Sequence, residues 1–192
     1  MAPSSYGSLP TYVLRPPGAG ALSKFVSATA PAIELMTDFC YEDPCVVSPE
    51  RQIDDALGDM ISQGVGALLV VGDNDVLGLV TATDIRGERP RRFLQRSSCK
   101  GVVNRRSDIR TADIMTPMEA MRLLTFTWVT RSCLGDLAAV FREVEATHLL
   151  AVEDTGDTGA NVVRGIFSRS RLERECASSV AQTEGGSEEC QR

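Results

Sequence analysis

The sequence lacks most of the patterns that mark enzymes. It has one histidine, His148, and contains no GxSxG elbow, no HExxH zinc-protease pattern and no phosphate-binding P-loop. Its six cysteines include no CxxC pair, and a structural zinc site needs clustered Cys and His ligands. We therefore expect no catalytic site, no metal site and reduced thiols.

Long apolar runs are also missing. The N-terminus, "MAPSSYGSLP", has no charged region followed by an apolar stretch, and no later window approaches the roughly twenty apolar residues of a membrane span. The formal net charge of −6 argues against a dedicated nucleic-acid binder, which needs Lys and Arg to neutralise phosphates. These absences predict a cytoplasmic protein without membrane contact and do not favour nucleic acid as a partner.

One basic stretch departs from this acidic balance. Residues 86–106, "RGERPRRFLQRSSCKGVVNRR", carry eight Lys and Arg against one Glu. The stretch lacks the interleaved aromatic residues of a single-strand binder, so a solvated face on a helix and linker is the favoured interpretation. Holding a polyphosphate, an acidic partner or nucleic acid is the alternative.

An internal repeat organises the middle of the chain. Residues 53–71 and 134–152 overlay without gaps, and in each copy apolar residues at helical spacing are followed by a short apolar run. A turn-rich insert and a second apolar run come next. "ELMTDF" and "DIMTP" introduce the two copies, and "CVVSP" and "FTWVT" read as short extended pieces. Each unit is thus predicted to be β-α-β-β-α.

Two such units should pack together, because each leaves one face of its sheet uncovered. The predicted core residues are Ile53, Leu57, Met60, Leu68 and Val70 in the first unit and Leu134, Leu137, Phe141 and Leu149 in the second.

Each unit closes on a similar decapeptide, "GLVTATDIRG" and "GIFSRSRLER". In the first, Thr81 ends a strand and Asp84 begins a helix, where free backbone N–H groups and the helix dipole favour an anion. The Thr81 hydroxyl can donate to a phosphate, and the Asp84 carboxylate can accept from both hydroxyls of a ribose. The same two residues can also form an ordinary helix cap. In the second decapeptide, Ser168 keeps the hydroxyl, but Arg171 has only donors and cannot accept from a diol.

Two β-α-β-β-α units with these Met-Thr entries and closing decapeptides resemble tandem CBS (cystathionine-beta-synthase) domains, a pair called a Bateman module. The stretch "DIRGERP" is similar to stand-alone bacterial CBS-pair proteins. The resemblance implies an α+β fold whose two units are related by a pseudo-two-fold axis. The expected segments are an extended N-terminal arm over 1–31, a first CBS domain over 32–98, a linker over 99–112, a second CBS domain over 113–176 and a disordered tail over 177–192.

The resemblance also implies that an adenine nucleotide (AMP, ADP or ATP) binds in a cleft between the repeats. The residues expected to line it are Gly66, Ala67, Leu79, Thr81, Thr83, Asp84 and His148. A second cleft is expected to be degenerate and to be lined by Thr37, Ile166, Ser168, Ser170 and Arg171. The roles of two residues stay open. His148 either approaches phosphates or is a hydrogen-bonded histidine at the rim of the core. Arg171 contacts a phosphate from the neighbouring site, pairs with an acid or is a solvated surface arginine.

For function, the resemblance implies a non-catalytic, ligand-sensing regulatory module. It would act through the conformation of a homodimer or of an unidentified protein partner, with no cofactor besides the regulatory nucleotide. A structural dimerisation module with vestigial clefts is the main alternative. Binding of S-adenosylmethionine or of nucleic acid ranks below both.

Overall fold

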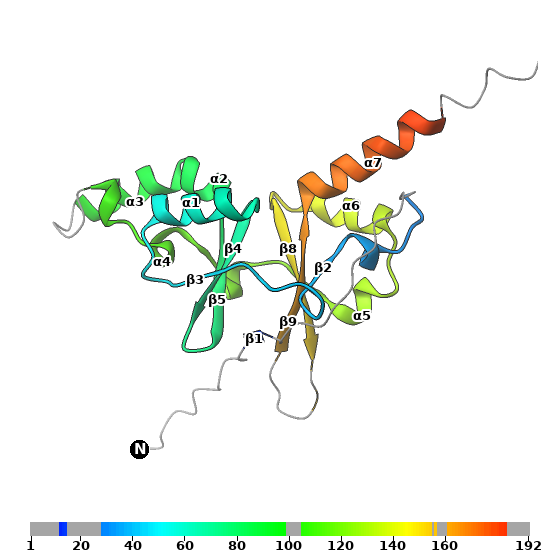
Figure 1. The fold of residues 1–192 in the computed structure, drawn as a ribbon, viewed down its shortest axis with the longest axis horizontal. Helices are drawn as coiled ribbons and strands as arrows, with labels where there is room; N and C mark the ends of the chain where they lie inside the picture. Colours follow the sequence, from blue (N-terminus) through cyan, green and yellow to red (C-terminus); the bar gives the residue numbers. More distant parts are fainter. Residues whose placement is uncertain (1–11, 15–27, 99–104, 155, 157–160, 184–192) are drawn as a thin grey trace, which may run out of the picture.

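Two similar halves lie side by side in the computed structural model, which describes residues 12–14, 28–98, 105–154, 156 and 161–183 (Figure 1). The first repeat comprises η1 (Ala32–Leu35), β2 (Thr37–Asp38), β3 (Val46–Val47), α1 (Ile53–Gln63), β4 (Ala67–Gly72), β5 (Asp75–Thr81), α2 (Ala82–Arg86) and α3 (Arg89–Ser98). The second repeat comprises α4 (Thr111–Ile114), β6 (Thr116–Pro117), η3 (Met118–Ala120), β7 (Leu123–Thr125), α5 (Phe126–Val129), α6 (Leu134–Glu143), β8 (His148–Asp154), β9 (Asn161–Ser168) and α7 (Arg169–Thr183).

Local sequence signals account for the elements of the first repeat. The side chain of Gln52 accepts hydrogen bonds from two backbone amides of the first turn and so caps α1, and Gly64 ends the helix at a φ of 68°. Asp73 and Asn74 form the two-residue turn between β4 and β5 with φ values of 52° and 67°. Two consecutive positive φ angles are what a type I′ hairpin turn requires.

The strand order is symmetric about its middle. It runs β3-β4-β5-β1-β9-β8-β7, and a register shift interrupts the hairpin at matching places, between Val70 and Val71 and between Ala151 and Val152. The strand β1 (Tyr12–Leu14) joins the halves by pairing with both β5 and β9. The predicted α+β pair of similar units with a pseudo-two-fold relation is therefore confirmed, whereas the strand in the N-terminal arm was not foreseen.

The two Met-Thr segments are exchanged between the repeats. Strand β2, from the first repeat, pairs with β9 of the second, and β6 pairs with β5 of the first. The glycines of the closing decapeptides permit this approach, because a Cβ atom on Gly78 would lie 2.3 Å from the carbonyl oxygen of Thr116 and one on Gly165 would lie 2.6 Å from that of Thr37. Each decapeptide glycine thus serves backbone packing against the opposite repeat.

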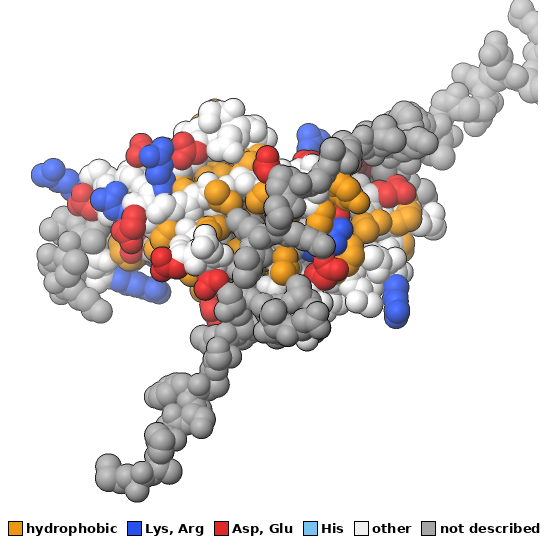
Figure 2. All heavy atoms as spheres, turned by 60° about the horizontal axis from the view of Figure 1, so that its bottom comes forward, with side chains coloured by type: hydrophobic (Ala, Val, Ile, Leu, Met, Phe, Trp, Pro, Cys, Tyr) orange, Lys and Arg blue, Asp and Glu red, His pale blue; other side chains and the backbone are white. Residues whose placement is uncertain are grey.

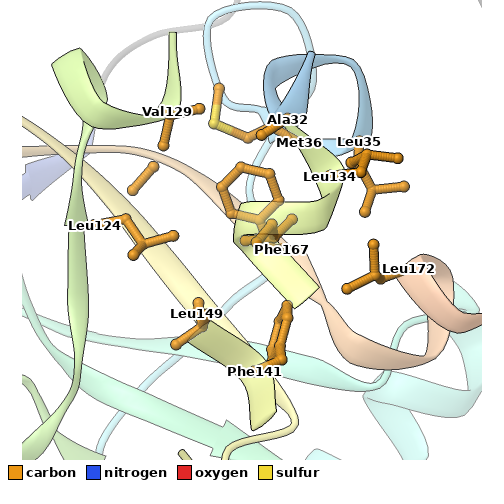
Figure 3. Close-up of a cluster of buried hydrophobic side chains, with 12 residues drawn as sticks. Ala32, Leu35, Met36, Leu124, Val129, Leu134, Phe141, Leu149, Phe167 and Leu172 are labelled. Atoms are coloured by element: carbon orange, nitrogen blue, oxygen red, sulfur yellow. The ribbon is translucent and has the colours of Figure 1, made fainter. Parts of the chain in front are cut away.

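Three hydrophobic clusters form the core, one in each repeat and one shared. Figure 3 shows the cluster of the second repeat, where side chains from η1, α6, β8 and β9 meet around Phe167. The shared cluster consists of Phe39, Ala67, Leu69, Val76, Leu79, Met118, Leu150, Val152 and Val163. All predicted core residues belong to the repeat clusters, although Leu57 is only partly buried.

Three local predictions differ from the structure. "FTWVT" is not extended: β7 ends just before it, and Thr125 caps the short helix α5 by accepting from the amide of Trp128 at 3.3 Å. Helix α7 continues to Thr183, beyond the expected boundary at 176, and the rest of the tail, 184–192, lies outside the described residues. The expected linker is partly built into the first repeat through the short helix η2 (Arg106–Asp108) and the fully buried Ile109.

Among the described residues, no helix is both long enough and apolar enough to span a bilayer.

Candidate functional site

The first cleft is a cavity of about 370 Å³ between the two repeats. One wall is the end of β5 with the start of α2, and the other is the segment that leads from α6 into β8. The lining residues are Leu79, Thr81, Thr83, Asp84, Arg89, Thr116, Ala120, Met121, Arg122, Val144, Glu145, Ala146, Thr147, His148 and Leu149.

Asp84 is tightly held at the start of α2. Its Oδ2 accepts hydrogen bonds from the Thr81 amide at 2.9 Å and from the Thr81 hydroxyl at 2.8 Å, while the Asp84 amide donates to Thr81 Oγ1 at 3.1 Å. This reciprocal capping box satisfies donors that a helix start leaves free. The Thr81 hydroxyl therefore gives its only proton to Asp84, and in this geometry it does not donate to a phosphate. Asp84 Oδ1 is the oxygen that faces Arg89.

Arg89 joins three segments of the first cleft. Its Nε lies 3.0 Å from Asp84 Oδ1, and its Nη1 donates to the carbonyl oxygen of Ile114 at 2.8 Å and to Thr116 Oγ1 at 2.9 Å. The guanidinium thus connects α3, the capping box and the exchanged strand β6. Because Arg89 is always charged, the cleft presents a fixed cation beside a fixed carboxylate.

The opposite wall is fixed by Arg169, the first residue of α7. Its guanidinium donates to the carbonyl oxygen of Phe141, in the last turn of α6, and to those of Val144 and Ala146, which follow the helix. Cations at a helix C-terminus are favoured by the exposed carbonyls and the dipole. Arg169 therefore orders the 144–147 segment that lines the cleft.

His148 lies between the two clefts and lines both. Its Nδ1 is 3.0 Å from the hydroxyl of Thr147, and a Cβ atom on Gly66 would lie 3.6 Å from its Cε1. Burial lowers the pKa of His148 to about 4, although the negative charge of Asp84 acts in the opposite direction. At neutral pH the imidazole is therefore uncharged and hydrogen-bonded, and it can offer one donor rather than a positive charge.

The second cleft, of about 330 Å³, lies on the other side of His148. Its lining residues are Thr37, Phe39, Glu42, Asp43, Cys45, Gly64, Val65, Gly66, Ala67, Leu69, His148, Ile166, Ser168, Ser170, Arg171 and Arg174. Arg171 donates to Thr37 Oγ1 at 3.2 Å, and the hydroxyls of Ser168 and Ser170 are 2.9 Å apart. Arg171 is half-buried in the cleft wall, so the alternative of a solvated surface arginine does not hold.

The structure divides the predicted residues differently from the sequence-based expectation in one respect. Leu79, Thr81, Thr83, Asp84 and His148 lie together in the first cleft, and all five residues predicted for the second cleft lie there. Gly66 and Ala67, however, line the second cleft. Ala67 pairs with Thr81 where the hairpin meets the clefts, and the two strands border different cavities: the end of β5 lines the first cleft, and the start of β4 lines the second together with the opposite decapeptide.

Sequence reasoning missed Arg89, Thr116 and the 144–147 segment. Arg89 follows Asp84 by five residues in the basic stretch, and this proximity was the only available signal. Thr116 reaches the cleft through strand exchange, which no local pattern reports.

The site offers no metal ligand set. Within the described part of the chain, no three His, Cys, Asp or Glu side chains gather closely enough to hold a metal ion. Of the cysteines, Cys45 lines the second cleft, and burial raises the pKa of its thiol, with a further contribution from the charge of Glu42. The described cleft residues can therefore bind by hydrogen bonds, charge and apolar contact.

Comparisons with known proteins agree with this architecture. Residues 32–90 match the family model of the CBS domain, and no curated protein matches the chain at a significant level. The chain is similar to an uncharacterized conserved protein from Pyrococcus horikoshii at 25% identity and a TM-score of 0.52, covering 80% of this chain and 95% of that one.

Two further solved structures share the fold. CBSX2 of Arabidopsis thaliana, determined in complex with AMP, matches at 21% identity and a TM-score of 0.52, over 81% of this chain and 98% of that one. A putative acetoin utilization protein (AcuB) from Vibrio cholerae matches at 16% identity and the same TM-score of 0.52, over 82% and 98% of the two chains.

Proposed function

We propose that this tandem CBS-domain pair is a non-catalytic regulatory module that binds an adenine nucleotide between its repeats. Binding would change the conformation of a homodimer or of a protein partner. The observation that carries the proposal is the first cleft, where a carboxylate and a guanidinium are held side by side in a cavity that also has apolar lining residues.

The chemistry of this cleft suits the parts of a nucleotide. Apolar contacts for a base come from Leu79, Met121 and Leu149. Asp84 Oδ1 can accept a hydrogen bond from a ribose hydroxyl, and Arg89 can donate to a phosphate. Thr83, which is exposed and lines the cleft, is a further hydroxyl for a phosphate. The neutral His148 can donate to an anion only through one ring nitrogen, so the two arginines of the cleft, Arg89 and Arg122, are the principal phosphate contacts.

The AMP complex of CBSX2 supports the choice of nucleotide. A shared fold does not by itself transfer a ligand, since function depends on the residues of the site. The CBSX2 complex shows that this architecture holds AMP in one protein. In the present chain the decapeptide of the first cleft carries the acid that a ribose needs, whereas Arg171 stands at the equivalent position in the second cleft. We propose that nucleotide occupies the first cleft preferentially.

One observation favours the alternative of a structural module with vestigial clefts. Both oxygens of Asp84 already have protein partners, Thr81 on one side and Arg89 on the other. A ribose would have to share Oδ1 with the Arg89 guanidinium. If Asp84 served only as a cap, its replacement would change stability but not binding.

The substitution Asp84→Asn separates these roles. Hydrogen bonds to charged groups contribute about 1.5 to 3 kcal/mol, so the affinity for AMP should fall on the order of ten- to a hundredfold. Titration calorimetry with the full chain measures this change. The melting temperature of the parent protein should also rise when AMP is added, because a ligand that binds only the folded state stabilises it.

A matched control is available at the start of α6. Asp136 occupies the same third position of its helix and accepts from the Cys133 amide at 2.9 Å, but it lines neither cleft. Asp136→Asn should lower the free energy of unfolding by about 1 kcal/mol, as the weakened cap in Asp84→Asn should, and leave AMP affinity unchanged. Equal AMP affinity in the parent and in Asp84→Asn would reject the nucleotide role of Asp84.

A further inference from the structure

A separate groove borders the first cleft along helix α3. It has a volume of about 260 Å³ and is lined by Arg89, Arg92, Phe93, Arg96, Asp113, Ile114 and Met115. Three of these seven residues are arginines, and Asp113 is the one acid. The groove is therefore basic although the whole chain is acidic.

The three arginines form a stripe along one face of α3. Residues at spacings of three and four lie on the same side of a helix, so positions 89, 92 and 96 follow one another along the groove. Phe93 and Leu94 pack against the core of the first repeat and fix the rotation of the helix. Figure 2 shows Lys and Arg side chains at the end of the molecule that carries α3, with a few acidic side chains between them.

Arg92 and Arg96 are not engaged by the protein's own acids. Both are exposed, and in the described part of the chain no carboxylate lies within ion-pair distance of either. Asp113, the acid of the groove, accepts from the backbone amide of Arg110 at 2.8 Å. Arg91, by contrast, pairs with Glu88 at 3.9 Å and does not line the groove. The unpaired arginines are thus those that face the cavity.

Arg89 connects the groove to the first cleft, since it lines both. Its Nε and Nη1 are held by Asp84, Ile114 and Thr116, while Nη2 has no partner among the described residues. The 113–116 segment also borders both cavities, with Thr116 in the first cleft and Ile114 and Met115 in the groove. The two cavities are therefore neighbours that share the Arg89 side chain as a common wall.

We infer that the ligand of the first cleft is a nucleoside di- or triphosphate, whose phosphate chain runs past Arg89 onto Arg92 and Arg96. This inference rests on the proposed nucleotide function and adds the class of nucleotide. Guanidinium groups match the planar pairs of oxygens on a phosphate, and successive arginines on a helix face match a chain of phosphates. A monophosphate in the first cleft does not reach Arg92 or Arg96, because these two arginines line only the groove.

The inference is tested by titrating the full chain with AMP, ADP and ATP in magnesium-free buffer at moderate ionic strength. Exposed ion pairs are individually weak, and two of them together amount to about a tenfold change in affinity. ATP should bind about tenfold more tightly than AMP, with ADP between them. In the double variant Arg92→Gln/Arg96→Gln, the ATP affinity should fall to that of AMP while the AMP affinity stays unchanged.

Arg91→Gln is the matched control, because it removes an arginine from the same helix but not from the groove. It should leave all three affinities unchanged. Inorganic tripolyphosphate should bind at least tenfold more weakly than ATP, because it lacks the nucleoside that fills the cleft. Provided that AMP still binds, any one of three results would overturn the inference. These results are equal affinity for AMP and ATP, unchanged ATP affinity in the double variant, and tripolyphosphate binding as tight as ATP binding. Failure of all three nucleotides to bind would instead overturn the proposed function.

Discussion

The substitution Gly78→Ala tests whether strand exchange holds the two repeats together. A Cβ atom at this position would lie 2.3 Å from the carbonyl oxygen of Thr116 and 3.0 Å from Cα of Pro117. Both obstacles are backbone atoms of β6, so no side chain can rotate to relieve the contact. The exchanged strand would have to move away from β5 by about 1 Å to reach an ordinary carbon–oxygen separation.

The expected cost follows from the contacts that this movement loosens. Overpacking a well-packed site costs typically 1 to 3 kcal/mol, and each weakened backbone hydrogen bond adds about 1 kcal/mol. Alanine in a strand regains roughly 0.5 to 1 kcal/mol over glycine through the entropy of the unfolded chain. We expect a net loss of about 3 kcal/mol in the free energy of unfolding. Nucleotide binding should weaken as well, since Thr116 lines the first cleft and holds Arg89.

Gly58→Ala provides the control with the same chemical change. Gly58 lies inside α1 and is exposed, and a Cβ atom there would meet nothing within 4 Å. This variant should gain about 0.5 to 1 kcal/mol from helix propensity. Urea unfolding followed by circular dichroism, together with AMP titration, measures both effects. Parent-like stability of Gly78→Ala, with Gly58→Ala behaving as expected, would refute the close approach of β6 to β5.

Three further outcomes are expected. Burial lowers the pKa of His148 from 6.5 to about 4 in the folded protein, so between pH 6.5 and pH 4 the unfolded chain binds more protons than the folded one. The free energy of unfolding should therefore fall by up to about 3 kcal/mol as the pH drops from 6.5 to 4. The only histidine of the chain gives a single ring-proton NMR titration, and a midpoint near 6.5 would contradict this burial. His148→Gln should abolish that part of the pH dependence. Asp38→Ala should cost about 2 kcal/mol in urea unfolding, because Arg164, whose side chain is 13% exposed, loses its bidentate partner and keeps Glu153 at 3.0 Å. Asp59→Ala, which breaks an exposed bidentate pair, should change stability by less than 1 kcal/mol, and equal effects would contradict the importance of burial.

The sequence alone determined the type and order of most elements. Helical spacing of apolar residues, the turn residues between β4 and β5 and the matched decapeptides are local features, and local conformation follows from them. The repeat added that the two halves have the same fold and share a core. For this reason the predicted core residues were confirmed, from Ile53 to Leu149.

The sequence was less informative where neighbouring signals competed. "FTWVT" is rich in residues that favour strands, yet Thr125 caps a helical turn there and the strand ends before it. The tail residues after 176 are polar, but α7 carries the helix on to Thr183. Both outcomes depend on what precedes the segment rather than on its own composition.

The tertiary structure alone decided which surfaces meet across the pseudo-two-fold relation. An overlay of repeats shows that Gly66 and Thr147 are equivalent, but not that Gly66 faces the opposite decapeptide. The exchange of β2 and β6 places Thr37 and Thr116 beside cleft residues that are distant in sequence. Arg89 becomes a cleft residue through its contacts to Ile114 and Thr116. Pairing between strands distant in sequence is set by the packing of the whole sheet, and the periodicity of a single strand reports only which of its faces is buried.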